Sequence, residues 1–248
     1  MGEQKKTFVV TRFDPDRDDA PTTREYEIAV QPDWKTLDAL NFIKDHVDGT
    51  LAYRWSCRMA VCGSCGMMVN GEPRLTCKDV LSQYGDTVHI APLANFPVVR
   101  DLVIEFDGFM EKFERVKPWI LRAKEKAVEE GTHRQSPEQL ADFQHFSMCI
   151  NCMLCYAACP VVSNEPAFLG PAAIALGHRY NLDSRDEGNG ARNQVFRGDG
   201  TVFSCSYANE CSEVCPKKVD PAAAVNQAKI GALLDWAKGL VLPRGGPE

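Results

Sequence analysis

The sequence has no excess of basic residues and no basic segment interleaved with aromatic side chains. Its 34 Asp and Glu residues outnumber its 28 Lys and Arg residues, which leaves a formal charge of −6. Proteins that bind nucleic acid use clustered Lys and Arg to neutralise phosphates. We therefore expect no nucleic acid partner.

Motifs for substrate chemistry are also missing. The chain contains no phosphate-binding loop, no dinucleotide-binding fingerprint and no signature that joins a nucleophile to a base. Any reaction on an organic substrate is therefore expected to take place on another chain.

Neither a signal peptide nor a membrane span is expected. Residues 1–13 contain no apolar signal core and no twin-arginine pair, so we do not expect secretion. Residues 144–164 are uncharged over a membrane-length stretch, but they include four cysteines, several polar residues and a proline. This pattern favours a buried segment that carries ligands.

The first part of the chain has the periodicity of strands with one helix. Segments 7–13 and 24–30 alternate and predict a hairpin, whereas the apolar spacing in 34–49 predicts a helix. Two further strand signals are 66–77, with Asn70-Gly71 as its turn, and 86–93 before a proline. This part is expected to be α+β and to end near residue 105.

The second part of the chain, residues 106–248, is expected to be mostly helical. Ser136-Pro137 and Asp220-Pro221 each place a capping residue before a proline, which predicts helix starts at Pro137 and Pro221. The charged stretch 111–134 is interpreted as a solvated helix and connector. The segments with helical periodicity are 101–116, 136–149, 170–183 and 220–241.

Cysteine is the residue type that stands out. The chain has 11 cysteines, an odd number, gathered in three short groups, and a chain of 248 residues needs no disulfide framework to build a core. Thiolate ligation of metal in a reducing compartment explains the pattern better.

The first group has the plant-type two-iron spacing. It reads CRMAVCGSC and is followed by one more cysteine, that is C-x4-C-x2-C with a fourth cysteine after eleven intervening residues. A four-cysteine zinc site is the alternative, but zinc motifs usually come as two CxxC pairs. The predicted [2Fe–2S] ligands are Cys57, Cys62, Cys65 and Cys77.

The second and third groups are related to each other. CINCMLCYAACP is the C-x2-C-x2-C-x3-C-P run, in which three cysteines bind one cubane and the fourth binds another cluster. CSYANECSEVCP is the same run with Ala208 in place of its second cysteine. Crossing the ligands gives Cys149, Cys152, Cys155 and Cys215 to a [4Fe–4S] cluster, and Cys159, Cys205 and Cys211 to the other site.

We expect the three-cysteine site to hold a [3Fe–4S] cluster. The cysteines then divide as 4 + 4 + 3, and the odd total is explained. Two alternatives remain: a cubane whose fourth iron takes a ligand other than cysteine, with Glu210 as a neighbour of this site, and an empty structural site.

Together the motifs resemble the iron–sulfur subunit of succinate dehydrogenase and fumarate reductase, the respiratory complex II family. The resemblance covers nearly the whole chain and is carried by four stretches, namely YRWSCRMAVCGSCGMMVNG, FSMCINCMLCYAACP, GPAAIALGHRYNLDSRDEG and CSEVCPKKVDPAAA.

The resemblance implies an N-terminal β-grasp plant-type [2Fe–2S] ferredoxin domain at 1–105 and an all-α helical ferredoxin domain at 106–248 with the [4Fe–4S] and [3Fe–4S] clusters. It also implies partners: a flavoprotein that carries FAD and performs the dicarboxylate chemistry, and one or more transmembrane anchor subunits that bind quinone. The chain would then relay electrons in the respiratory chain or the tricarboxylic acid cycle, at the cytoplasmic face of the cell membrane.

For the quinone end, the resemblance points to residues around the three-cysteine site, namely Pro160, Ser206, Asn226 and Lys229. Ubiquinone-reducing members commonly have a tryptophan where this chain has Asn164 and a histidine where it has Ser206. These departures resemble the menaquinone-linked fumarate reductases, and Lys229 matches a lysine near the quinone in that type. A solvated helix lysine is the alternative for Lys229.

Other functions are compatible with part of the pattern. The chain could serve another flavoenzyme, such as a glycolate or glycerol-3-phosphate dehydrogenase, although the long matching stretches favour the first family. A free soluble ferredoxin would not need three clusters. A zinc-binding scaffold would be colourless and would contain stoichiometric zinc.

Overall fold

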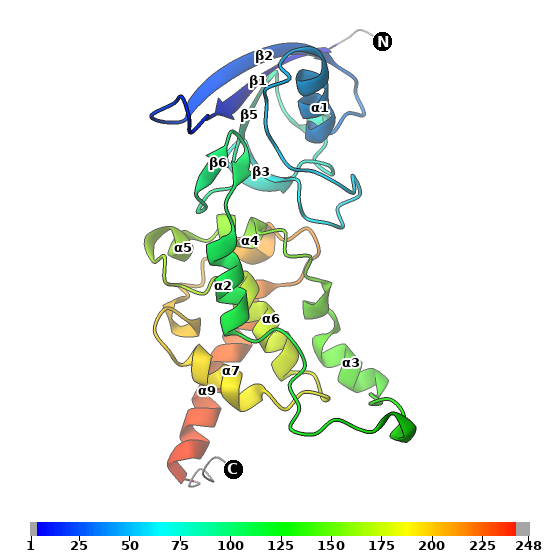
Figure 1. The fold of residues 1–248 in the computed structure, drawn as a ribbon, viewed down its shortest axis with the longest axis vertical. Coiled ribbons are helices and arrows are strands. Elements are labelled where there is room, and N and C mark those ends of the chain that lie inside the picture. The colour runs from blue at the N-terminus through cyan, green and yellow to red at the C-terminus, as the bar shows by residue number, and fades with distance from the viewer. Residues whose placement is uncertain (1–3, 242–248) are drawn as a thin grey trace. The chain divides into compact units, whose positions relative to one another are not determined.

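The computed structural model describes residues 4–241. Its chain divides into two compact units, one formed by Met1–Asp107 with Ile150–Ala158 and the other by Gly108–Cys149 with Cys159–Glu248. The strands belong to the first unit and most of the helices belong to the second (Figure 1). The predicted α+β class is therefore confirmed.

The first unit is built on a mixed five-stranded sheet with the strand order β2-β1-β5-β3-β4. The predicted opening hairpin is present, because β1 and β2 pair antiparallel with Phe8 opposite Tyr26. β1 pairs parallel with β5, and β3 pairs antiparallel with both β4 and β5. The strands are β1 (Gln4–Arg12), β2 (Thr22–Val30), β3 (Gly66–Val69), β4 (Glu72–Leu75) and β5 (Thr87–Ala91).

One face of this sheet is covered by the helix α1 (Thr36–His46) (Figure 1). The strand residues Phe8 and Val10 are fully buried, as are Leu40 and Ile43 on the helix. They belong to one apolar cluster, so the period of two in the strand and the helical spacing predicted from 34–49 converge on the same core. The 3-10 helix η1 (Leu81–Gln83) contributes Leu81 to it.

The helix predicted for residues 101–116 is wrong at its N-terminal end. β7 (Val103–Ile104) pairs antiparallel with β6 (Val98–Arg100), and the helix α2 spans Asp107–Arg115. β-branched side chains are stiff in a way that favours strands. The partner strand β6 precedes residue 101, so the spacing of apolar residues within 101–116 cannot reveal this pairing.

Two buried carboxylates of the first unit, Asp48 and Asp101, share one arginine. The guanidinium of Arg12 donates to Asp48 Oδ2 at 2.6 Å and to Asp101 Oδ1 at 2.9 Å, and the Tyr26 hydroxyl donates to the same Asp48 oxygen at 2.8 Å. Burial opposes ionisation of Asp48, but the hydrogen bonds from Thr50, Tyr26 and Arg12 outweigh it and lower the pKa of this carboxyl. The network ties the first hairpin to the loops after α1 and β6.

The second unit is mostly helical, as predicted. Both predicted helix starts are confirmed: the Ser136 hydroxyl accepts from Gln139 N at 3.2 Å at the start of α3, and Asp220 Oδ1 accepts from Ala223 N at 3.1 Å at the start of α9. Besides most of α2, its α-helices are α3 (Pro137–Gln144), α5 (Pro160–Asn164), α6 (Pro171–Asn181), α7 (Asn189–Phe196), α8 (Glu210–Glu213) and α9 (Pro221–Val241).

Small residues bring α6 and α9 together. Ala173 and Ala175 of α6 and Ala224 and Ala232 of α9 are at most 1% exposed, and the two helices pack side by side with α7 (Figure 1). A Cβ on Gly177 of α6 would come within 2.9 Å of the Phe196 ring. The absence of side-chain bulk on α6 therefore sets how closely its neighbours approach.

A fully buried arginine fastens the connector that follows α2. Both terminal nitrogens of Arg192 bind the carboxylate of Asp186, at 2.6 and 2.9 Å. The same guanidinium donates to the carbonyl oxygens of Val116, Lys117 and Trp119 at 2.7–3.1 Å. Within the charged stretch 111–134, the helix α2 continues to Arg115. Apart from the 3-10 helix η2 (Val128–Glu130), residues 116–135 contain no helix or strand and form the connector.

Between residues 4 and 241, none of the helices combines the length and the apolar composition that crossing a membrane requires.

Candidate metal centres

The first cysteine group forms a tight loop at the edge of the sheet. Arg58 and Ala60 have positive φ angles of 56° and 55°, and Gly63 has a φ of 76°. These left-handed residues curl the backbone around Cys57 and turn amide groups inward. Glycine occupies one of these left-handed positions, and residues with side chains occupy the other two.

The Cys57 sulfur lies inside that loop as an acceptor. It accepts from the backbone N–H groups of Met59, Val61 and Cys62 at 3.3–3.4 Å. These hydrogen bonds lower the pKa of the Cys57 thiol to about 6. A sulfur that is stabilised as a thiolate by backbone amides is a suitable ligand for iron in a plant-type centre.

Cys65 and Cys77 lie at the buried side of the same loop, where they are 2% and 8% exposed. Thr76 N donates to Cys65 O at 3.1 Å, which brings the two cysteines to the same point of the β3–β4 hairpin. Burial, together with the nearby Cys77 sulfur, raises the pKa of the Cys65 thiol to about 12. A bound metal would reverse this, because a coordinating thiol is deprotonated. The residues therefore fit a [2Fe–2S] centre.

Residues 150–158 pack in the same unit as this loop, although they lie far along the sequence. A Cβ on Gly63 would lie 2.9 Å from the Cα of Cys152, and a Cβ on Gly66 would lie 3.2 Å from the Cys152 carbonyl oxygen. Asn95 Nδ2 donates to the carbonyl oxygens of Tyr156 and Ala157 at 3.0 and 3.1 Å. The segment with Cys152 and Cys155 is thus held against the loop of the first group.

Three other cysteines gather within the second unit. Burial raises the pKa of Cys211 to about 12, and the sulfurs of Cys159 and Cys205 add to the effect by their negative charge. The pKa of the Cys159 thiol is likewise raised, mainly by burial and also by the nearby Cys205 sulfur. Each of the three sulfurs is therefore close enough to influence another, and they are the set that the crossed-ligand pattern assigns to the third cluster.

Cys149 and Cys215 also lie in the second unit. Both pack against one buried apolar cluster, which is formed by Phe146, Ala175, Val219 and Ala224. The Cys215 sulfur accepts from Val219 N at 3.3 Å. Cys152 and Cys155, the other predicted [4Fe–4S] ligands, belong to the first unit.

The second and third groups share one local fold. Cys149 and Cys205 each follow a 3-10 helix, η3 (Phe146–Met148) and η4 (Val202–Ser204), with φ and ψ of −60° and 130° in one case and −64° and 124° in the other. A short helix follows each, α4 (Leu154–Ala157) or α8 (Glu210–Glu213), and then Cys-Pro.

Positive φ angles recur at matching positions inside this repeated fold. Asn151 and Met153 have φ of 53° and 65°, and Tyr207 and Asn209 have φ of 63° and 64°. Ala208 therefore occupies the backbone position that Cys152 has in the other copy, with a methyl group in place of the thiol. The backbone of the third group thus has the conformation that carries a cysteine in the second group, but its residue is alanine.

Among the described residues, no three His, Cys, Asp or Glu side chains converge closely enough to hold one metal ion. In a cluster each thiolate binds one of several iron atoms, so the cysteines do not need to meet at a single point. The chemistry of the donor set and its surroundings is what fits iron–sulfur clusters here.

The residues predicted for quinone lie around the third group. Pro160 and Ser206 directly follow Cys159 and Cys205 in sequence. Lys229 Nζ donates to the carbonyl oxygen of Cys205 at 3.2 Å, so α9 brings this lysine to the cysteine loop.

Tyr207 connects the Cys205–Cys211 loop to α9, a role that the sequence motifs do not predict. Its ring lies 4.1 Å from Lys229 Nζ, and its hydroxyl donates to Asn226 Oδ1. The signal that could have found it is its position, because it is an aromatic residue inside the Cys205–Cys211 loop.

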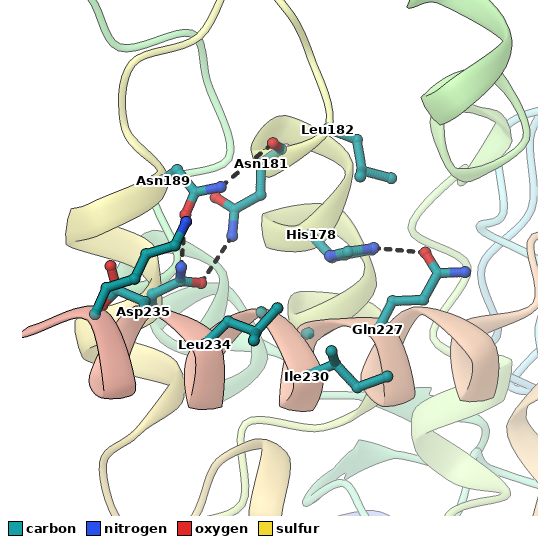
Figure 2. Close-up of a pocket in the computed structure, with 12 residues that line it drawn as sticks. His178, Asn181, Leu182, Asn189, Gln227, Ile230, Leu234 and Asp235 are labelled. Atoms are coloured by element: carbon teal, nitrogen blue, oxygen red, sulfur yellow. Dashed lines mark hydrogen bonds between the residues drawn. The ribbon is translucent and has the colours of Figure 1, made fainter.

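A groove of about 420 Å³ opens between α6, α7 and α9 of the second unit, and no site was predicted there (Figure 2). His178 Nε2 and Gln227 Oε1 are 2.8 Å apart in its lining, and burial lowers the pKa of His178. Asn181, Asn189 and Asn193 are linked by hydrogen bonds on its other side (Figure 2). The lining contains no cysteine.

Known protein families match both cysteine-bearing parts of the chain. Residues 7–111 match a family described as a 2Fe-2S iron-sulfur cluster binding domain, and residues 145–219 match a 4Fe-4S dicluster domain. The fumarate reductase iron-sulfur subunit of Mycobacterium tuberculosis is 51% identical over 96% of both chains.

More distant relatives are of the succinate dehydrogenase type. The mitochondrial succinate dehydrogenase [ubiquinone] iron-sulfur subunit 2 of Oryza sativa is 38% identical over 90% of this chain and 74% of that protein. A chain of the Mycobacterium smegmatis Sdh1 complex in the apo form superposes with a TM-score of 0.82 at 27% identity, over 98% of this chain and 100% of that one.

Proposed function

The chain belongs to the family of iron–sulfur subunits of fumarate reductase and succinate dehydrogenase, and from this premise we propose a division of its eleven cysteines among three clusters. It is an electron-transfer subunit with a [2Fe–2S] domain and a dicluster domain. It resembles the fumarate reductase subunits more closely than the succinate dehydrogenase subunits.

In the proposed division, Cys57, Cys62, Cys65 and Cys77 hold the [2Fe–2S] cluster, and Cys149, Cys152, Cys155 and Cys215 hold the [4Fe–4S] cluster. Cys159, Cys205 and Cys211 hold a [3Fe–4S] cluster. The observation that carries this assignment is the repeated backbone of the second and third groups, with Ala208 at the position of Cys152. The mutual influence of the three remaining sulfurs supports it.

When bound, the clusters supply one-electron relay chemistry between a flavin and a quinone. The protein contributes orientation and shielding. The backbone amides around Cys57 stabilise its thiolate, the burial of Cys65 and Cys77 excludes water, and the close packing at Gly63 keeps the second group next to the first.

A flavoprotein partner that carries FAD is proposed for the [2Fe–2S] side. Around the first cysteine loop, Trp55, Met59 and Val61 are 41%, 70% and 54% exposed. Exposed apolar side chains grouped at a functional loop are typical of a protein interface. Dicarboxylate chemistry is assigned to that partner, since the chain has no motif for it.

Quinone, in particular menaquinone, is proposed at the third cluster, where Pro160, Ser206, Asn226 and Lys229 line the site together with an anchor subunit in the membrane. The contact of Lys229 with Cys205 and the replacement of the expected tryptophan and histidine by Asn164 and Ser206 support this assignment. The subunit would then lie at the cytoplasmic face of the cell membrane, attached through its anchor.

Purification of the native complex tests the proposal. We expect the chain to copurify with an FAD protein and to contain iron and acid-labile sulfide for three clusters. Electron paramagnetic resonance should show a three-iron signal in the oxidised complex. A protein that runs alone without flavin, or one that contains stoichiometric zinc, would contradict the proposed function.

A further inference from the structure

The ammonium of Lys229 is held at the third cysteine group by two contacts from the loop that begins at Cys205. Lys229 Nζ donates to the carbonyl oxygen of Cys205 at 3.2 Å and lies 4.1 Å from the centre of the Tyr207 ring. Tyr207 in turn donates its hydroxyl hydrogen to Asn226, one helical turn before Lys229. The lysine is therefore not free to sample solvent as most helix lysines do.

The helix backbone that carries this lysine is fixed as well. On α9, Val225, Ala228 and Ala232 are at most 1% exposed, so the helix is anchored on the faces next to Lys229. The helix also packs against η4, the 3-10 helix that leads into Cys205. A cation on a rigid support beside a cluster ligand exerts a constant field on the cluster.

We propose that Tyr207 is a positioning residue that holds the Lys229 ammonium beside the third cluster, and that this fixed charge raises the reduction potential of that cluster. The inference rests on the proposed three-iron assignment. Reduction adds one electron, delivered by the relay itself, and so adds one negative charge to the centre. A nearby cation stabilises the reduced form more than the oxidised form, and cluster potentials depend on net charge and hydrogen bonding.

The ring of Tyr207 has a specific part in this arrangement. An aromatic face attracts an ammonium group that lies over it, and the interaction strengthens as water is removed. The left-handed φ of 63° at Tyr207 belongs to the loop that wraps the cluster site, so the ring is presented by the same backbone that carries Cys205 and Cys211. Tyr207 thereby couples the loop to α9.

Charges of opposite sign are also present. Ser204 Oγ donates to Glu165 Oε1 at 3.0 Å, so a carboxylate approaches the same loop just before Cys205. A carboxylate at this point opposes the effect of the lysine on the potential. The net electrostatic effect on the cluster therefore depends on how close the Lys229 ammonium is held, relative to the Glu165 carboxylate.

The test is a redox titration of the three-iron signal by electron paramagnetic resonance in the purified complex. We expect Lys229→Met to shift the midpoint potential of this cluster downward, and Tyr207→Leu to shift it in the same direction by a smaller amount. Tyr207→Phe, which keeps the ring and loses the hydroxyl, should shift it less than Tyr207→Leu. Potentials of the other two clusters should stay unchanged.

Lys238→Met is the matched control, because it removes a positive charge from an exposed position farther along the same helix. It should leave the potential at the wild-type value. A wild-type potential in Tyr207→Leu with an intact three-iron signal overturns the positioning role, and a wild-type potential in Lys229→Met overturns the electrostatic effect. Absence of the three-iron signal from the wild type would instead refute the cluster assignment, and this inference with it.

Discussion

Gly63 and Cys152 are in direct backbone contact, since a Cβ on Gly63 would lie 2.9 Å from the Cα and 3.0 Å from the Cβ of Cys152. The two residues are 89 positions apart in sequence and belong to different cysteine groups. The same glycine has a φ of 76°, which the wrapping of the first loop requires. One residue without a side chain therefore serves both the loop and its contact with the second group.

Gly63→Ala should be destabilising for two reasons that can be separated. The new methyl group is strained by the positive φ and also collides with backbone atoms of Ile150 and Cys152. We expect the free energy of unfolding to fall by about 1–3 kcal/mol for the overpacking alone, measured by denaturant unfolding. The control is Gly71→Ala, where φ is 84° but no atom lies within 4 Å. Equal losses in both variants would refute the role of the contact.

Ala208→Cys should complete the third cysteine run. Because the backbone there repeats that of Cys152, the new thiolate can bind a fourth iron and convert the cluster to [4Fe–4S]. We expect the three-iron signal to disappear from the oxidised complex, and the potential of the centre to fall because thiolate charge is added. Ala208→Ser is the control and should retain the signal. Persistence of the signal in the cysteine variant would contradict the assignment.

Asp186→Asn should weaken the second unit and change its response to acid. Burial opposes ionisation of Asp186, but the hydrogen bonds from Arg192 and from the N–H groups of Leu121 and Gly188 outweigh it and lower its pKa. The carboxylate therefore stabilises the fold above the ordinary Asp pKa, and this contribution disappears as the pH falls through the lowered value.

The expected loss at neutral pH is about 3–5 kcal/mol, because one partner of a buried ion pair is removed. Denaturant unfolding at several pH values would measure it, and the variant should lose less stability than the wild type as the pH falls below the ordinary pKa of an Asp carboxyl. The exposed pair Lys5–Glu27 supplies a control, since Glu27→Gln should leave stability unchanged at neutral pH. A variant with the acid response of the wild type would show that Asp186 does not contribute to it.

Lys229→Ala should slow the reaction with quinone while leaving reduction of an artificial dye by succinate intact, since a dye can accept electrons before the last step. We expect quinone turnover to fall several-fold, measured in the complex with a menaquinone analogue. Lys238→Ala on the same helix should retain wild-type turnover. Unchanged quinone kinetics would show that Lys229 has no part in the reaction with quinone.

Local signals in the sequence were enough for part of the fold. Ser136 and Asp220 cap their helices as predicted, because a cap depends on a hydroxyl or carboxylate and an N–H a few residues away. The hairpin turn at Asn70-Gly71 is also confirmed, with φ angles of 48° and 84°. Such features are decided within a few residues and are readable from spacing.

Features that depend on distant partners could not be predicted in this way. The strand Val103–Ile104 was assigned to a helix because its pairing with β6 is not visible inside its own window. The packing of residues 150–158 on the sheet unit depends on two glycines of another group, which leave no periodic signal. At the candidate site, cysteine spacing predicts the ligand sets, and this assignment stays a prediction. Tyr207 can be recognised only from the approach of α9, which spacing does not reveal.

The fastening of the connector by Arg192 divides that segment into two parts of different accessibility. Val116 to Trp119 are tied by their carbonyl oxygens to a buried guanidinium, whereas residues 123–132 are exposed. Proteases need a stretch that can detach from the surface, and exposed irregular segments are their preferred targets. In limited digestion with trypsin, cleavage should therefore begin after Lys124 or Lys126, and cleavage after Arg115, which directly precedes the residues tied to Arg192, should follow much later.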